Sequence, residues 1–361
     1  MNTMTLDRQA ASASLKSKRE AIADDMAMLR TAAELTRELN PPRPLIYWSD
    51  LIASSVVGYG ALVAAVLAPT TGWALFAGLI ATLALYRAMS FIHEISHLKH
   101  ASVPGFRLGW NLLSGIPLLI PSFMYEGVHN LHHARTRYGT SEDPEYLPLA
   151  LMKPWTLPLF VVASLLAPVA LLVRYAVLSP LSAIIPPLRK AVVERYSSLS
   201  INPSFRRRAP EGVDKARWTR LEIATSLWAI TLVALVATGV LPLRAFGIVL
   251  AVASGVAVIN QVRTLVAHLW ENEGEAMTVT AQYLDTVNVP PPALLPVLWA
   301  PVGLRYHALH HLLPGLPYHA LAEAHRRISA ALDSGSPYHN ASYPGLPGLV
   351  GKIARSTMMA R

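Results

Sequence analysis

The chain has 361 residues, of which 53% are hydrophobic and only 15% are charged, and its mean hydropathy is +0.36. Soluble proteins carry about a quarter charged residues, so this composition excludes an ordinary soluble enzyme and favours an integral membrane protein. The absence of cysteine excludes thiolate metal ligands and disulfides. A net charge of +9 in a membrane protein marks cytoplasmic loops, so we expect no nucleic-acid partner.

The two ends of the chain differ in composition from the middle. Residues 1–45 are charged, mixed in sign and without the apolar core of a signal peptide, which predicts a cytoplasmic surface helix or tail. Residues 46–334 hold the apolar runs and form the expected membrane domain. Residues 335–361 are rich in glycine and proline and are expected to be a C-terminal tail.

Two pairs of apolar runs have the length that a bilayer requires, roughly 17–25 residues. Residues 51–67 and 73–92 form the first pair, and residues 223–241 and 245–262 form the second. A third apolar region, 155–187, contains five prolines, and its roughly 50 Å of helix is short for two spans. We expect that region to be re-entrant or interfacial, or else a short hairpin.

Basic residues indicate which side of the membrane each loop occupies. Lys and Arg crowd residues 189–220, so this segment should be cytoplasmic. Each hairpin then starts and ends in the cytoplasm. The chain is therefore predicted to be an all-α polytopic bundle of the inner membrane, with at least four spans in two hairpins and a cytoplasmic helical cap. Arg87 and Arg263, near span ends, should reach the interface, where Tyr125 and Trp270 are expected as anchors.

Histidines form three clusters with matching spacings. Residues three and four apart share a helix face, so each cluster directs several imidazoles toward one point. A further histidine, His268, follows the last span by about six residues, which places it at a similar depth. Imidazole suits iron, zinc and copper, so the pattern predicts a polynuclear metal site at the membrane surface. The clusters are His93, His97 and His100, then His129, His132 and His133, then His307, His310 and His311.

The motifs HxxxH, HxxHH and HxxHH, in this order and separated by apolar spans, resemble those of the integral-membrane fatty acid desaturase and hydroxylase superfamily. The resemblance covers roughly residues 51–327, and the run LLPGLPY at 312–318 is also similar to the family. It implies two iron ions, with O₂ as co-substrate. His100 has no dependable counterpart, and Thr264 stands where some members have asparagine. The implied ligands are His93, His97, His129, His132, His133, His268, His307, His310 and His311.

Carboxylates beside such rings should orient them by accepting the free N–H. Proximity in sequence offers six candidates, of which we expect one or two to have this role: Glu94, Glu126, Asp143, Glu145, Glu271 and Glu273. Isolated histidines usually have other roles, so His319, His325 and His339 are not expected to bind metal.

The resemblance implies an O₂-dependent desaturase that acts on a long-chain acyl lipid. The alternative is a hydroxylase of a lipid, alkane or carotenoid on the same scaffold. The two reactions differ in whether the substrate loses a second hydrogen or receives a hydroxyl group. No haem domain is visible, so a separate ferredoxin or cytochrome with its reductase should supply electrons. The head group, chain length, position of attack, electron donor and oligomeric state stay open.

Two unrelated functions fit the sequence less well. His93-Glu94-x-x-His97 has the HExxH form of a zinc protease, but a protease would not need two HxxHH clusters. A metal transporter would need polar or ionisable residues deep within several spans, and the cores of these spans are nearly free of them.

Overall fold

The structure is a computed structural model that describes residues 22–99, 101–147, 153, 155–272 and 274–356. Within these residues the regular elements are helices, and β-pairing is limited to isolated bridges. Five of the described helices are long and apolar enough to cross a membrane. The predicted all-helical membrane fold is therefore confirmed.

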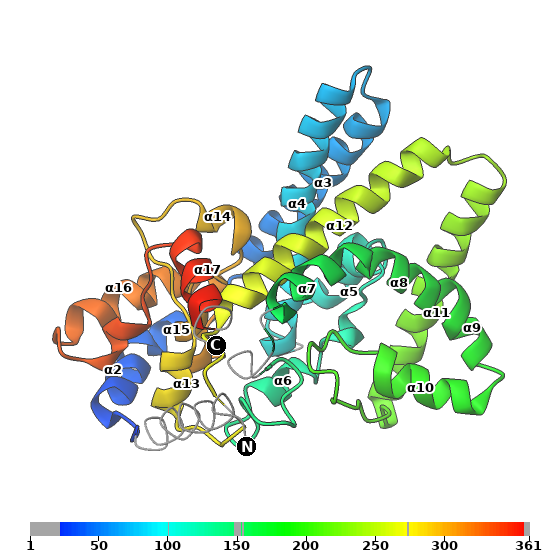
Figure 1. Cartoon of the computed structure of the whole chain (residues 1–361). Helices are drawn as coiled ribbons and strands as arrows, with labels where there is room; N and C mark the ends of the chain where they lie inside the picture. The colour runs from blue at the N-terminus through cyan, green and yellow to red at the C-terminus, as the bar shows by residue number, and fades with distance from the viewer. Residues whose placement is uncertain (1–21, 100, 148–152, 154, 273, 357–361) are drawn as a thin grey trace, which may run out of the picture.

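The first hairpin consists of α3 (Pro44–Leu67) and α4 (Thr71–His97), which project together in Figure 1. Proline at the first position of α3 suits a helix start, and the Thr70 hydroxyl accepts a hydrogen bond from the backbone N–H of Trp73. A Cβ on Gly58 would lie 2.7 Å from Leu85 Cδ2. Glycine at this position therefore lets the two helices approach closely.

The second hairpin consists of α11 (Gly212–Ala237) and α12 (Leu243–Ala267). A Cβ on Gly255 of α12 would lie 2.8 Å from Thr82 Cγ2, so α12 packs closely against α4. At the far ends of the hairpins, Arg244 donates hydrogen bonds to the carbonyl oxygens of Val66 (2.8 Å) and Ala68 (3.3 Å). Both predicted hairpins are thus present, and the membrane half of the fold is a bundle around α4 and α12.

The proline-rich region forms one bent helical run and not a two-helix hairpin. A 3₁₀ turn and a π turn interrupt the run, and prolines lie along it. Residues Pro158–Ser182 are long and apolar enough to span a membrane, yet Figure 1 shows an arc and not a rod parallel to α3 and α4. This shape agrees with the re-entrant or interfacial arrangement. The helices of the run are α7 (Thr156–Ala163), α8 (Ala167–Val173) and α9 (Ser179–Ser182).

A buried ion pair holds the end of this arc against α11. Arg174 Nη2 lies 2.8 Å from Glu222 Oε1, and Arg189 of α10 (Pro186–Tyr196) reaches the other oxygen at 2.8 Å. A buried carboxylate with two guanidinium partners satisfies the hydrogen bonding that removal from water requires. The arc is therefore fixed at its C-terminal end.

The helical cap lies beside the lower ends of α4 and α12 (Figure 1). Met28 and Ala32 of its first helix share a buried apolar cluster with Ala324 and Ile328. The described part of the expected C-terminal tail also folds back, so that Leu349 is fully buried beside Trp270. The cap helices are α2 (Met26–Thr36), α13 (Val279–Asp285), α14 (Pro296–Trp299), α15 (His307–Leu312), α16 (Leu321–Ala331) and α17 (Leu346–Ala354).

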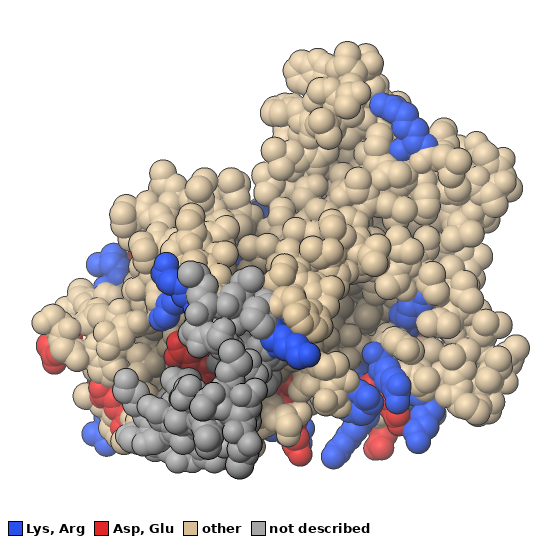
Figure 2. Space-filling view, in the orientation of Figure 1, with Lys and Arg blue, Asp and Glu red and all other residues tan. Residues whose placement is uncertain are grey.

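Charged side chains are distributed unevenly between the cap and the membrane hairpins. Figure 2 shows charged side chains gathered along the lower edge and the cap, while the projecting hairpins are almost free of them. Arg87 pairs with Asp50 at 2.5 Å, and the Tyr318 hydroxyl donates to the same carboxylate at 2.9 Å. This contact ties the first hairpin to the segment that follows the third histidine cluster.

Candidate metal centre

Four separate pieces of chain bring the histidines together. The first cluster ends α4, the second lies on the short helix α6 (His129–His132), and the third lies on α15. His268 directly follows α12, where the backbone becomes extended and pairs with Thr286. Both membrane hairpins and the cap therefore contribute to one site.

The nine histidines implied by the family resemblance converge into two groups, each compact enough to hold a metal ion. In each group the potential ligand atoms lie within 4.8 Å of one another. The five-histidine group contains His93, His97, His129, His133 and His310, and the four-histidine group contains His132, His268, His307 and His311.

The spacing of ring nitrogens matches that of ligands around one ion. In the five-histidine group, Nε2 of His133 lies 2.9 Å from that of His129 and 3.2 Å from that of His310. In the four-histidine group, Nε2 of His307 lies 3.1 Å from that of His268 and 3.2 Å from that of His311. Nitrogens about 2.1 Å from a metal and at right angles to each other would be about 3.0 Å apart. The donor set therefore fits a metal ion in each group.

Several ring nitrogens are buried without a hydrogen-bond partner. They include Nε2 of His97, Nε2 of His132 and both nitrogens of His93. Such orphaned polar atoms are costly in a folded protein and require an explanation. Coordination of a metal ion would satisfy them.

Two carboxylates fix the orientation of rings in α6. Nδ1 of His132 lies 2.9 Å from both oxygens of Asp143, and Nδ1 of His129 lies 2.8 Å from Glu145. The Tyr125 hydroxyl donates to Glu145 and lies 2.8 Å from the same His129 nitrogen. Because Nδ1 carries the proton in these contacts, the Nε2 lone pair of each ring faces its histidine group.

Burial keeps most of these rings neutral. The pKa values of His129, His133 and His268 lie well below the usual value. The main cause is burial, and the second is the neighbouring histidines. The same causes act on His307, His310 and His311. For His132, burial lowers and the Asp143 carboxylate raises the pKa, with a net rise. Burial raises the pKa of Glu145 to about 7. A neutral imidazole is the form that binds metal.

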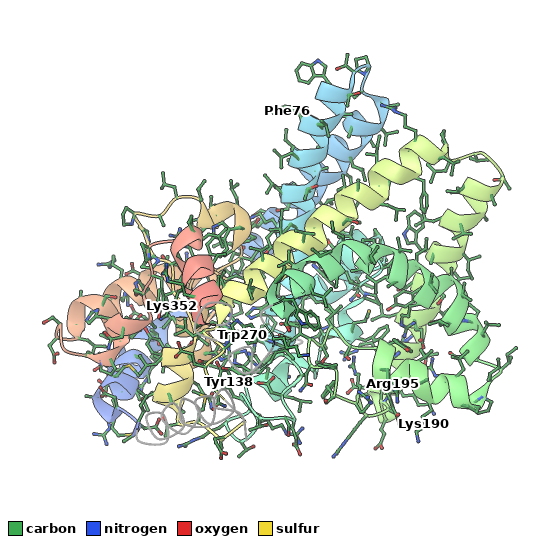
Figure 3. The ribbon with its side chains drawn as sticks, in the orientation of Figure 1. Phe76, Tyr138, Lys190, Arg195, Trp270 and Lys352 are labelled. Atoms are coloured by element: carbon green, nitrogen blue, oxygen red, sulfur yellow. The ribbon has the colours of Figure 1, made fainter. Side chains whose placement is uncertain are left out.

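A third carboxylate, Asp285, supports His268 indirectly through the hydroxyl of Tyr138. The Tyr138 hydroxyl lies 3.0 Å from Nδ1 of His268 and donates to Asp285 at 2.9 Å, while Tyr146 donates to the same carboxylate at 2.8 Å. The ring of Trp270 packs against His268 at 5.1 Å between centroids. In Figure 3, Tyr138 and Trp270 lie at the foot of α12, far from Lys190 and Arg195 on α10.

These contacts were only partly foreseeable from the sequence. Asp143 and Glu145 have the predicted orienting role, whereas Glu94 accepts from Tyr47 (2.5 Å) and Tyr318 (3.1 Å), and Glu126 pairs with Arg107. Asp285 and the tyrosines were missed, because no local motif marks them. Tyr125 and Trp270 are buried at the site and are not interface anchors. Of the remaining carboxylate candidates, Glu271 has its backbone N–H 3.5 Å from Asp285, and Glu273 lies outside the described residues. His100 of the first histidine cluster also lies outside them.

The three isolated histidines lie outside both groups, as predicted. Nε2 of His319 accepts from the backbone of Arg43, and His325 contacts the Tyr338 hydroxyl. His339 contacts the carbonyl oxygen of Asp333.

A cavity of about 690 Å³ opens beside His93. One wall is a single face of the bent run, with Leu159, Phe160, Ala163, Ala167 and Leu171 at helical spacing. Residues of α12 line another part of the cavity, and four of them are polar: Asn260, Gln261, Arg263 and Thr264. Its volume lies within the range of small-molecule sites, roughly 300–1,000 Å³. The cavity can hold a mainly apolar molecule with a polar part, next to the five-histidine group.

Comparison with known proteins identifies the family. The sequence pattern of the fatty acid desaturase family matches residues 71–343. A ceramide hydroxylase of Caulobacter vibrioides (strain NA1000 / CB15N) is 48% identical over 337 residues, which cover 92% of this chain and 95% of that protein. No solved structure matches the chain significantly. The chain therefore belongs to the fatty acid desaturase family and is an oxidoreductase of the membrane desaturase and hydroxylase superfamily.

Proposed function

We propose that this protein hydroxylates a ceramide-like lipid with O₂ at two iron ions, one held by each histidine group. The sequence alone favoured desaturation, with hydroxylation as the alternative. The similarity to a ceramide hydroxylase over almost the whole chain favours hydroxylation, and our proposal rests on this observation. The cavity supports a lipid substrate, because it is lined both by apolar residues that suit a chain and by polar residues that suit a head group.

The nine histidines are the proposed ligands. Nine imidazole donors without thiolate suit non-haem iron, whereas zinc has no redox chemistry to offer. Bound iron would supply the redox chemistry that reduces and splits O₂. In the overall reaction, one oxygen atom enters a C–H bond and the other leaves as water. Two protons and two electrons complete the balance, with the electrons delivered by a separate donor protein.

The protein's own residues would hold the substrate and exclude water. His93 lines the cavity, so a chain in the cavity passes the five-histidine group. The apolar face of α7 and α8 would cover the chain and keep bulk water from the reacting carbon. Asp143, Glu145 and the Tyr138–Asp285 pair would keep the rings in the orientation that binding requires.

The proposed electron donor is an acidic ferredoxin or cytochrome on the cytoplasmic side. Its docking surface would lie below α6, where Arg137 and Arg206 to Arg208 line a cleft with Arg217. Opposite charge on the two proteins would guide their encounter. The cleft also touches Val128 and Leu131 of the second histidine segment, which would give electrons a short path to the site.

Lipid mass spectrometry tests the proposed reaction. Cells that express the protein should contain a ceramide species with one additional oxygen atom, and cells that express the His132→Ala, His310→Ala double variant should lack it. Loss of two hydrogens from the same lipid would instead establish desaturation. If both cell types had the same lipids, with a suitable donor present, the enzyme assignment would fail.

A further inference from the structure

Arg263 is a buried cation with no ion pair to a carboxylate among the residues that the structure describes, and the Glu145 carboxylate of the same cavity acts on it only through space. It lies on α12 within a candidate membrane span, and only 9% of its surface is exposed. Its Nε has no hydrogen-bond partner, and it forms no ion pair with any residue that the structure describes. From its place near a span end we expect Arg263 to reach the interface, and its burial contradicts that expectation. An ionisable group at such a position is costly, which indicates a functional partner.

The surroundings of Arg263 point to the cavity as the source of that partner. Arg263 lines the cavity together with Asn260, Gln261 and Thr264, so the polar groups of this helix gather on one wall. The hydroxyl of Tyr86 interacts with Arg263 and donates its own proton to the carbonyl oxygen of Trp299 at 2.9 Å. This contact holds Arg263 at the cavity wall, where a bound ligand can reach its side chain.

Arg263 also lies close to the histidines. It precedes His268 by five residues, which is about 7.5 Å along a helix. Its positive charge contributes, after burial and neighbouring histidines, to the lowered pKa of His268 and His307. His93 lines the same cavity. A group bound by Arg263 would therefore lie next to the metal centre and not at the far end of the cavity.

We propose that Arg263 binds the acyl carbonyl oxygen of the substrate, with Asn260 and Gln261 contacting the rest of its polar head. This inference rests on the proposed function and deepens it, because it predicts where the hydroxyl group is added. With the carbonyl at Arg263, the carbons next to it face His93, and the remaining chain follows the apolar wall of α7 and α8. Hydroxylation should then occur at the first carbons of the acyl chain and not in its middle.

The oxygen that accepts a hydrogen bond from Arg263 could belong to an amide or to a free carboxylate. A guanidinium donates to either, and the bond to a carboxylate would be the stronger. The cavity wall favours the amide, because Asn260 and Gln261 can pair with the N–H and hydroxyl groups that a ceramide has and a fatty acid lacks. The experiment separates these two sources.

Ligand binding to the purified, iron-loaded, full-length protein tests the role of Arg263. The probes are N-palmitoyl ceramide, the matching N-alkyl analogue without the carbonyl oxygen, and free palmitate. Arg263→Met should weaken ceramide binding by about 10-fold or more, because a hydrogen bond to a charged donor is lost. It should leave binding of the N-alkyl analogue and the iron content unchanged. Arg263→Lys should fall between the two, and Arg195→Met, which removes an exposed charge on α10, should behave like wild type.

The outcomes separate this inference from the proposed function. Equal ceramide binding in wild type and Arg263→Met, with iron retained in both, would overturn the inference. A larger loss for palmitate than for ceramide would mean that a carboxylate is the natural ligand. Fragmentation of the product should place the hydroxyl group beside the carbonyl, and a mid-chain hydroxyl would refute the inference but not the hydroxylase proposal. If wild type hydroxylated no lipid, the proposed function would fail, while the binding data would still decide the role of Arg263.

Discussion

The two histidine groups differ in how the protein holds them and in what they face. The five-histidine group takes His93 and His97 from the end of membrane helix α4, and His93 lines the cavity. The four-histidine group draws on α6, α15 and the residue after α12, and all of its members are buried. Asp143 holds one of its rings, and Tyr138 with Asp285 supports another.

We therefore expect the two histidine groups to respond differently to substitutions around them. A group at the edge of a cavity can come close to a substrate. The four-histidine group has two rings supported by carboxylates, His132 directly and His268 through Tyr138, whereas the five-histidine group has one among the described residues, His129. The four-histidine group should therefore be the more sensitive to loss of supporting hydrogen bonds. The five-histidine group should be the more sensitive to changes in the cavity.

The largest expected effect is loss of a ligand from either group. His133→Ala and His311→Ala should each abolish product formation and lower bound iron, because each removes an Nε2 that lies about 3 Å from other ring nitrogens of its group. Elemental analysis of the purified variants and lipid mass spectrometry give the two readings. His339→Ala, outside both groups, is the matched control, and full activity in either ligand variant would refute the ligand assignment.

Removal of one orienting carboxylate should have the next largest effect. Asp143→Asn should weaken iron binding by roughly 10–100-fold, because both Asp143 oxygens contact Nδ1 of His132. Glu145→Gln should cost less, since Tyr125 also contacts Nδ1 of His129. Competition with a chelator measures both affinities. The proposed contrast between the groups would be wrong if Glu145→Gln were the more damaging variant.

A smaller effect is expected from the tyrosine that connects His268 to Asp285. Tyr138→Phe removes that hydroxyl and should weaken iron binding about 2- to 10-fold, as the loss of one neutral hydrogen bond would. Tyr146→Phe removes the other phenol bond to Asp285 and is the natural comparison. Equal iron affinity in both variants would show that the contact between Tyr138 and His268 does not contribute to iron binding.

The smallest effect on the metal centre is expected from the cavity wall. Ala167→Phe should narrow the cavity and shift the products toward shorter acyl chains, without change in bound iron. Val169→Phe, on the exposed side of the same helix, should leave the product profile unchanged. Chain-length profiles of the lipids distinguish them. An unaltered profile for Ala167→Phe would place the substrate elsewhere.

Much of the site was predictable because helical spacing and ligand chemistry act locally. The three histidine clusters needed only the rule that residues three and four apart share a helix face. The two hairpins needed only the length and composition of their apolar runs. The carboxylates Asp143 and Glu145 could be proposed by proximity because they lie in the segment after α6, 11 and 16 residues beyond His132 and His129.

The remaining features depend on contacts between distant segments. Asp285 reaches His268 through Tyr138, which lies more than a hundred residues earlier in the chain. Arg263 has the sequence context of an interface residue, and only the packing of α12 shows that it faces a cavity. The bend of residues 155–187 depends on packing against α11 and α12, which the positions of its prolines alone do not determine.

The most direct test of the central claim is the fate of isotopically labelled O₂. Membranes that contain the wild-type protein, its electron donor and ceramide should form a hydroxylated ceramide that carries one labelled oxygen atom. Membranes with His133→Ala or His311→Ala should form none. An added oxygen atom that came from water, or a labelled product that persisted in both variants, would contradict a hydroxylase centre built from the two histidine groups.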